Sequence, residues 1–134
     1  MRPQILIVDD DKAFQINLQL SLESSNWAVE SADDFQMAKQ KLEKKDYHLC
    51  LVDLHLDKRF DDLFEGLNLI PIIREKSPLS TVVAISCYSE SHKNLPAQAQ
   101  SLGAHDFVNK REMNPFRWIE FVSRTLKNVR MQIP

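Results

Sequence analysis

Three aspartates lie where two short apolar runs of the sequence end. Asp9 and Asp10 follow the run at 5–8, and Asp53 closes the run at 49–52. In an open α/β sheet the carboxyl ends of the strands form the crevice where ligands bind, so strands at these runs would bring the three carboxylates together. Crowded carboxylates repel one another, which raises their pKa values unless a cation neutralises them. Mg²⁺ suits this task, because it takes one or two carboxylates together with waters and phosphate oxygens.

Three further residues mark two later apolar runs. Ser86 closes the run at 82–85, Phe107 lies in the short run at 106–109, and Lys110 follows it. A hydroxyl and an ammonium in the same crevice would bind phosphoryl oxygens by hydrogen bonding and by charge. Together with the acids, they predict a pocket that holds a divalent cation and a phosphoryl group.

Apolar runs alternate with longer amphipathic segments along the chain, which predicts strand–helix units and a parallel sheet. The runs at 4–8, 49–52 and 82–85 are apolar almost throughout, as expected for strands covered on both faces. The segments at 27–31 and 106–109 are shorter or mixed, which is typical of edge strands. We therefore expect an α/β fold with a doubly wound five-stranded parallel sheet, in which the first, third and fourth strands are central and the second and fifth lie at the edges.

The helical segments differ in how clearly the sequence shows them. The last is the clearest, since Asn114 can cap it, Pro115 suits its first turn, and apolar residues repeat at three- and four-residue spacing. The segment at 14–22 alternates strictly between apolar and polar residues, which periodicity alone would assign to a strand. The architecture favours a helix instead, with Ile16 and Leu20 facing away from its core stripe.

Two prolines interrupt segments that otherwise fit helices. Pro71 and Pro96 each lack the N–H that a helix interior would use. We expect short or irregular starts to the third and fourth helices, with Asn68 or Asn94 as the cap and the proline in the first turn.

The bulk composition fits one domain over residues 1–134. The chain has 17 basic and 19 acidic residues, which gives no reason to expect direct binding of nucleic acid or a membrane surface. Cys50 and Cys87 lie in or beside strand-like runs and fit reduced thiols of a cytosolic protein. No signal peptide and no apolar stretch of about 20 residues is present. We expect a cytoplasmic domain without an output domain.

Four short motifs carry a resemblance to a known family. They are Ile-Val-Asp-Asp at 7–10, Leu-Val-Asp-Leu at 51–54, Ala-Ile-Ser at 84–86 and Gly-Ala-His-Asp-Phe-Val-Asn-Lys at 103–110. Each is weak alone, but in this order and spacing they resemble the receiver domain of bacterial two-component response regulators. The resemblance covers essentially the whole chain and implies a flavodoxin-like fold with the strand order 2-1-3-4-5.

The resemblance also implies a Mg²⁺ site and a phosphoacceptor. Asp10 and Asp53 would be direct metal ligands, with Asp9 acting through water and the backbone carbonyl of His55 completing the protein ligands. Asp53 would be the nucleophile that takes a phosphoryl group to give an acyl phosphate. The chain would thus be a phosphoacceptor with self-catalysed transfer and autodephosphorylation, not a turnover enzyme.

A switch is implied beside the phosphoacceptor. Lys110 would neutralise the transferring group, and the hydroxyl of Ser86 would bond a phosphoryl oxygen once it arrives. In the family the hydroxyl residue and an aromatic of the last strand move together and reshape the face made by the fourth helix, fifth strand and fifth helix. Phe107 matches that aromatic, and without a hydroxyl it should prefer burial at rest.

The resemblance implies partners as well. The phosphodonor would be a sensor histidine kinase or a histidine phosphotransfer protein, whereas the output partner stays unknown. The first helix often docks on the histidine-bearing bundle in this family, so exposed Ile16 and Leu20 are expected to face the phosphodonor. Whether the chain forms a homodimer is left open.

The chain departs from the family pattern in three places. Arg111 replaces the usual proline after Lys110, and a cis bond to a non-proline costs about 2.5–4 kcal/mol, so we expect a trans bond here. The stretch 55–65 includes a charged insertion, which fits either a solvated loop or a gate to the pocket. His55, Tyr88 and Cys87 would tune the loss of the phosphoryl group, with bulk slowing hydrolysis.

Two other functions fit parts of the pattern. A degenerate receiver would be an interaction module that never uses its phosphorylation site, which Arg111 and the insertion at 55–65 favour and the intact acids oppose. An aspartyl-phosphate phosphatase would use two acids spaced by one residue, as Asp9 and Asp11 are, but Ala13 replaces an expected threonine or valine.

Overall fold

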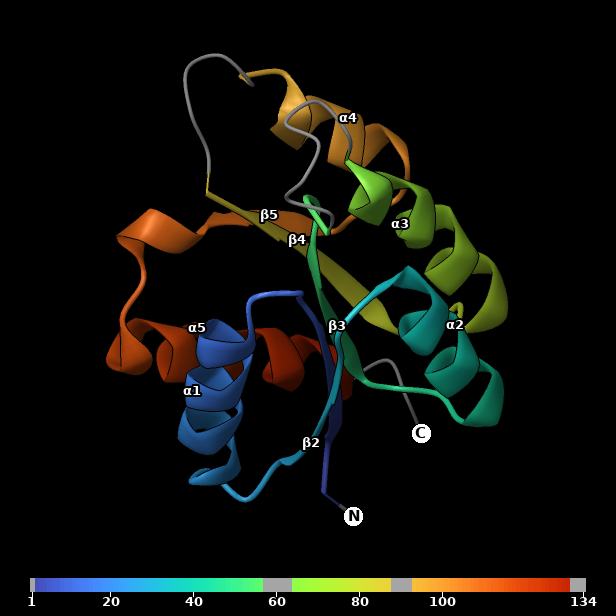
Figure 1. The fold of residues 1–134 in the computed structure, drawn as a ribbon. Coiled ribbons are helices and arrows are strands. Elements are labelled where there is room, and N and C mark those ends of the chain that lie inside the picture. The colour runs from blue at the N-terminus through green and yellow to red at the C-terminus, as the bar shows by residue number, and fades with distance from the viewer. Residues whose placement is uncertain (1, 57–63, 88–92, 131–134) are drawn as a thin grey trace.

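A five-stranded parallel sheet forms the centre of the computed structural model, which describes residues 2–56, 64–87 and 93–130. The strands are β1 (Gln4–Val8), β2 (Ala28–Ala32), β3 (Leu49–Asp53), β4 (Thr81–Ser86) and β5 (Asp106–Asn109). They lie in the order β2-β1-β3-β4-β5, with all neighbours parallel (Figure 1). The predicted α/β fold and strand order are therefore confirmed.

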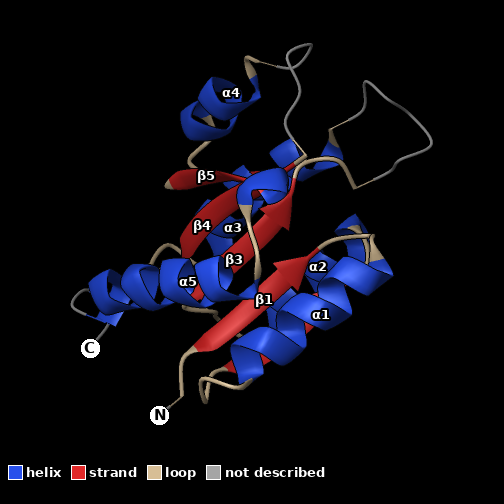
Figure 2. Cartoon of the chain, turned by 90° about the vertical axis from the view of Figure 1, so that its left-hand side faces the viewer, coloured by secondary structure: helices blue, strands red, loops and turns tan. Residues whose placement is uncertain are grey.

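Helices cover both faces of this sheet. They are α1 (Lys12–Glu23), α2 (Phe35–Lys44), α3 (Glu65–Lys76), α4 (Leu95–Ser101) and α5 (Pro115–Arg130), with a 3₁₀ turn, η2 (Lys110–Glu112), before the last. α1 and α5 pack together on one face, and α2, α3 and α4 follow one another across the other (Figures 1 and 2). None of the described helices is both long and apolar enough to cross a bilayer.

The two faces bury separate cores. Successive side chains of a strand point to opposite faces, so each central strand contributes to both. In β1, Ile5 and Ile7 pack beneath α1 and α5, whereas Leu6 and Val8 pack beneath α2 and α3. All four side chains are fully buried, which explains why this run is continuously apolar.

Helix α1 explains the strict alternation at 14–22. Leu18 and Leu22 are buried in the core, while Ile16 and Leu20 are 48% and 63% exposed. Side chains two residues apart lie on nearly opposite sides of a helix, so an alternating run produces one buried and one exposed apolar stripe. The predicted helix and its exposed stripe are confirmed.

Helix α3 begins earlier than expected. It starts at Glu65, not near Asn68, and Pro71 lies inside it. Ile70 and Ile73 of this helix are fully buried against the sheet, so the packing on either side of Pro71 offsets the cost of its missing N–H. The prediction of a late start was wrong for α3.

The other two predicted helix starts are confirmed. Asn94 is the residue before α4, and Pro96 lies in its first turn. The side chain of Asn114 caps α5, with its Oδ1 accepting a hydrogen bond from the N–H of Arg117 at 2.9 Å, and Pro115 is the first helical residue.

Candidate metal and phosphoryl site

Three carboxylates gather where β1 and β3 end. Figure 2 shows β1 and β3 side by side and running in the same direction. Val8 lies opposite Val52, so Asp9 and Asp53 follow at the same edge of the sheet. Ligand oxygens of Asp9, Asp10 and Asp53 all lie within 4.8 Å of one another. The side chains of Asp9 and Asp53 are buried, which makes their shared negative charge costly without a cation.

The same type of backbone hydrogen bond orients two of these carboxylates. Oδ1 of Asp9 accepts a hydrogen bond from the N–H of Asp11 at 2.9 Å. Oδ1 of Asp53 accepts one from the N–H of His55 at 3.0 Å. Each acid is thus held by the amide two residues further along, in the first turn after its strand.

Lys110 connects the second oxygens of the two acids. It follows β5 and begins η2, and its Nζ lies 2.5 Å from Oδ2 of Asp9 and 3.1 Å from Oδ2 of Asp53. Its side chain is only 10% exposed. The peptide bond to Arg111 is trans, as expected, and the N–H of Arg111 donates to Oδ1 of Asn109 at 3.0 Å.

The electrostatics of this cluster fit a divalent cation. Burial, and then the charge of Asp53, raise the pKa of Asp9 to about 6, against the opposing effect of Lys110. Burial alone would lower the pKa of Lys110, but Asp53 and Asp9 outweigh it, and the pKa is raised. Within the described residues, one ammonium therefore accompanies three carboxylates, and their oxygens form the kind of donor set that Mg²⁺ prefers.

The remaining predicted residues belong to β4, to the position just after it and to β5. Ser86 is buried at the end of β4, and its strand neighbour Ile85 lies opposite Asp53. Phe107 on β5 is half-buried against the core beneath α2, α3 and α4. Cys87 is exposed just after β4.

The predicted tuning residues and the insertion are described only in part. The ring of His55 is half-buried and lies against Phe64, with ring centroids 5.1 Å apart. Tyr88 and residues 57–63 of the charged insertion lie outside the described residues.

Asp11 takes a structural role. Its carboxylate caps α1 by accepting a hydrogen bond from the N–H of Phe14 at 3.1 Å, and it is exposed. The group of clustered acids in the described part of the chain consists of Asp9, Asp10 and Asp53 and leaves Asp11 out.

Sequence reasoning missed two residues that support the site. Gln15 on α1 is 2% exposed, and its amide donates to the carbonyl oxygens of Asp9 (3.2 Å) and Ala32 (3.3 Å) and to Oδ1 of Asp33 (3.0 Å). Its spacing from Leu18 places it on the buried stripe, and a lone amide on such a stripe was the available signal.

Gly66 is the second missed residue. A Cβ built on Gly66 would lie 2.1 Å from the carbonyl oxygen of Asp53, so the first turn of α3 approaches β3 more closely than any side chain allows. The N–H of Gly66 also donates to the carbonyl of Leu54 at 3.0 Å. The chain has only two glycines, which was the signal in the sequence.

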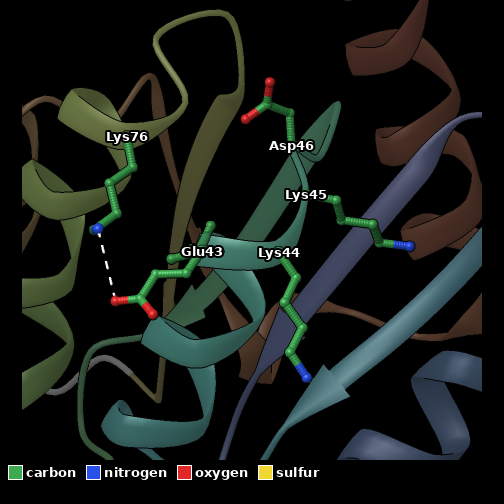
Figure 3. Close-up of a pocket in the computed structure, with 6 residues that line it drawn as sticks. Glu43, Lys44, Lys45, Asp46 and Lys76 are labelled. Atoms are coloured by element: carbon green, nitrogen blue, oxygen red, sulfur yellow. Dashed lines mark ion pairs between the residues drawn. The ribbon is translucent and has the colours of Figure 1, made fainter.

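An open pocket of about 410 Å³ lies near the opposite, amino-terminal end of β3 (Figure 3). It is lined by Leu42, Glu43, Lys44, Lys45, Asp46 and Lys76. Lys76 pairs with Glu43 at 3.8 Å, while α2 and α3 both end here, where lysines stabilise the negative ends of helices. The pocket has no part in the acid cluster.

The comparison with known protein families decides which family this fold and site represent. A family model described as "Response regulator receiver domain" matches residues 5–117. The chain belongs to this family. The receiver domain resembles the response regulator protein PilR of Pseudomonas aeruginosa, with 29% identity over 109 residues that cover 81% of this chain and 23% of PilR. It also resembles the alkaline phosphatase synthesis transcriptional regulatory protein PhoP of Bacillus subtilis, with 27% identity over 85% of this chain and 46% of PhoP. The receiver domain thus spans less than half the length of either relative.

Solved structures agree on the fold. A receiver domain protein (CheY-like) from Methanospirillum hungatei matches with a TM-score of 0.84 and 23% identity, over 99% of this chain and 100% of that one. A response regulator from Thermotoga maritima matches with a TM-score of 0.80 and 26% identity, over 95% and 99%. The flavodoxin-like receiver fold expected from the motifs is therefore confirmed.

Proposed function

We propose that this receiver domain accepts a phosphoryl group on Asp53 from a phosphohistidine, in a Mg²⁺-dependent reaction. The observation that carries the proposal is the cluster of Asp9, Asp10 and Asp53 with oxygens within 4.8 Å of one another, joined to the Nζ of Lys110. A carboxylate accepts a phosphoryl group readily only where surrounding positive charge offsets that of the incoming group.

Asp10 and Asp53 would hold Mg²⁺, with Asp9 through water and the backbone carbonyl of His55. When bound, the cation neutralises charge on the transferring phosphoryl oxygens. A carboxylate oxygen of Asp53 forms a bond to phosphorus while the bond between phosphorus and the donor imidazole nitrogen breaks. The acyl phosphate stays on the protein, and water later attacks it to return the carboxylate and inorganic phosphate.

Residues around Asp53 then change their contacts in response to phosphorylation. Lys110 loses part of its pairing with Asp53 and gains the phosphoryl oxygens, and the hydroxyl of Ser86 donates to one of them. Phe107 is half-buried in β5, opposite Ala84 of β4, and an inward turn of its ring would alter the surface of α4, β5 and α5. The domain acts as a switch for a partner, not as a turnover enzyme, and we place it in the cytoplasm.

Two partners follow from this function. Receiver domains take their phosphoryl groups from histidine kinases or phosphotransfer proteins, and we propose the same for this chain. The name of the relative PhoP describes it as a transcriptional regulatory protein, but the shared segment covers only 46% of PhoP. We therefore propose only that the output partner of this receiver binds the surface of α4, β5 and α5.

The decisive experiment measures intact mass after incubation with acetyl phosphate and Mg²⁺. The wild type should gain one phosphoryl group, and Asp53→Asn, which keeps the shape of the side chain, should gain none. Chelation of Mg²⁺ should abolish the gain. A wild type that binds no Mg²⁺ and gains no mass from acetyl phosphate or from its cognate kinase would instead identify a degenerate receiver.

The phosphatase alternative is disfavoured by the position of Asp11. Its carboxylate caps α1, so it does not form a catalytic pair with Asp9. Turnover of a generic phosphomonoester that is lost in Asp9→Asn and kept in Asp53→Asn would revive that alternative.

A further inference from the structure

The ammonium of Lys110 has an aromatic neighbour besides its two carboxylates. Its Nζ lies 4.2 Å from the centroid of the Phe14 ring, well within the range of a cation–π interaction. The same atom contacts Asp9 and Asp53, and the side chain is 10% exposed. Because little water reaches this ammonium, the attraction to the ring is stronger than at an open surface.

Phe14 is held in place from two helices. Its N–H is capped by Asp11 at the start of α1. Its ring meets Trp118 of α5 edge-on, with centroids 6.1 Å apart, and Trp118 meets Phe121 in the same manner at 6.3 Å. The ring that Lys110 contacts is therefore a fixed part of the contact between α1 and α5.

Mg²⁺ and Lys110 compete for the same oxygens. Both are cations that approach Asp9 and Asp53, so filling the metal site weakens the hold of these acids on the ammonium. Mg²⁺ takes oxygen ligands and does not compete for the ring. Among the described contacts of Lys110, the one to Phe14 thus persists when the acids are occupied.

We propose that Phe14 is a positioning residue for phosphoryl transfer, which keeps the ammonium of Lys110 at the acid cluster after the metal has bound. The inference rests on the proposed function of Asp53. It also explains how Lys110 can be positioned without the proline that usually follows it in the family. Here Arg111 follows through a trans peptide bond and continues η2. The side chain is then positioned from α1 as well as from its own backbone.

The test separates metal binding from transfer. Phe14→Leu should lower the rate of phosphorylation by acetyl phosphate at saturating Mg²⁺ by about 2- to 30-fold. Phe14→Leu should still bind Mg²⁺, because the ring contacts the lysine and none of the acids that would hold the metal, so the slower rate at saturating Mg²⁺ does not come from an empty metal site. Phe14→Tyr, which keeps an aromatic face, should retain the wild-type rate. Phe121→Leu is the matched control, since it removes the other ring that packs against Trp118 and should leave the rate unchanged.

A second pair of measurements distinguishes the electrostatic effect of the ring from its packing. Pentafluorophenylalanine at position 14 keeps the ring shape and reverses its quadrupole, so it should slow transfer as Phe14→Leu does. Without any phosphodonor, acetylation of Lys110 by an amine-reactive ester in saturating Mg²⁺ should be faster in both variants, as read by peptide mass spectrometry. A fluorinated protein with wild-type transfer and acetylation rates would overturn the role of Phe14 while leaving the phosphoacceptor intact. A wild type that takes no phosphoryl group would overturn the proposed function instead.

Discussion

Asp9 and Asp53 are oriented in the same way on neighbouring strands. In each, Oδ1 accepts the backbone N–H two residues further along and Oδ2 meets the Nζ of Lys110. One lysine from the end of β5 therefore connects the two acids, and the turns after β1 and β3 decide where their oxygens point. The stability of this arrangement and its affinity for cations are linked, because removing any positive charge leaves buried carboxylates uncompensated.

Replacing Lys110 tests this link. Lys110→Met should lower the free energy of unfolding at neutral pH by about 3–5 kcal/mol, because two buried carboxylates lose their partner. Urea denaturation should show this loss, and saturating Mg²⁺ should restore more stability to the variant than it adds to the wild type. Lys12→Met is the control, since Lys12 pairs with Asp33 at the surface, where an ion pair contributes about 0–1 kcal/mol. Equal losses in the two variants would contradict the central role of Lys110.

The two glycines offer a matched pair. Gly66→Ala should destabilise the protein and slow phosphorylation, because the added methyl group would meet the carbonyl of Asp53 at 2.1 Å and displace β3 or α3. Gly103→Ala should also destabilise, since Gly103 has φ of +117° and its Cβ would meet the side chain of Arg74. It lies before β5 and should leave the phosphorylation rate per folded molecule unchanged. The measurements are chemical denaturation and the rate of mass gain with acetyl phosphate.

Substitution of two glutamines of α1 can distinguish a residue that supports the acid cluster from one that supports only the fold. The Gln15 amide donates to the carbonyl of Asp9, whereas the Gln19 amide, one turn later, donates to the carbonyl of Val29 at 3.2 Å. Gln15→Met should lower the free energy of unfolding by about 1–3 kcal/mol, because the carbonyl of Asp9 loses the hydrogen bond from the buried amide, and it should weaken Mg²⁺ binding. Gln19→Met should not alter Mg²⁺ affinity. Calorimetric titration with Mg²⁺ gives the comparison, and equal affinities would show that Gln15 supports the fold alone.

The stability of the domain should depend on His105 in mildly acidic solution. Burial, and then the charge of Arg74, lower the pKa of His105, against the backbone hydrogen bond from Val82. As the pH falls, the His105 imidazole is therefore protonated in the unfolded chain before it is protonated in the folded protein. The free energy of unfolding falls as the pH drops from the unfolded pKa of about 6.5 towards the lower pKa of the folded protein. Above that window His105 contributes its full stabilisation. In His105→Asn, which keeps an acceptor for Val82, the free energy of unfolding should fall less steeply below pH 6.5; parallel profiles would exclude the effect.

The exposed stripe of α1 should select the phosphodonor. Ile16→Asp combined with Leu20→Asp should slow transfer from the cognate histidine kinase or phosphotransfer protein and leave phosphorylation by acetyl phosphate unchanged, because only the protein donor needs a docking surface. Leu79→Asp is the control, since Leu79 is 56% exposed in the turn before β4. Equal losses with both donors would refute the docking role.

Much of the fold and the outline of the site could be read from the sequence. Apolar runs that end in Asp9, Asp53 and Ser86 predict strands whose carboxyl ends meet, because parallel strands share one edge of a sheet. The edge strands were recognisable by their mixed polarity, and α1 by the architecture around it. These features are local or repeat along the chain, so periodicity and spacing reveal them.

Tertiary structure decided the contacts that join distant segments. Helix α3 tolerates Pro71 in its interior because the burial of neighbouring side chains outweighs the loss of a backbone hydrogen bond. Helix propensities alone do not predict this outcome. Phe14 meets Lys110, and Gly66 meets Asp53, only because the sheet brings α1 to the end of β5 and α3 to the end of β3. The sequence by itself determined which groups could bind a cation and a phosphoryl group. Their geometry, and the ring that holds the lysine, depend on packing between elements far apart in the chain, and packing is not encoded in local pattern.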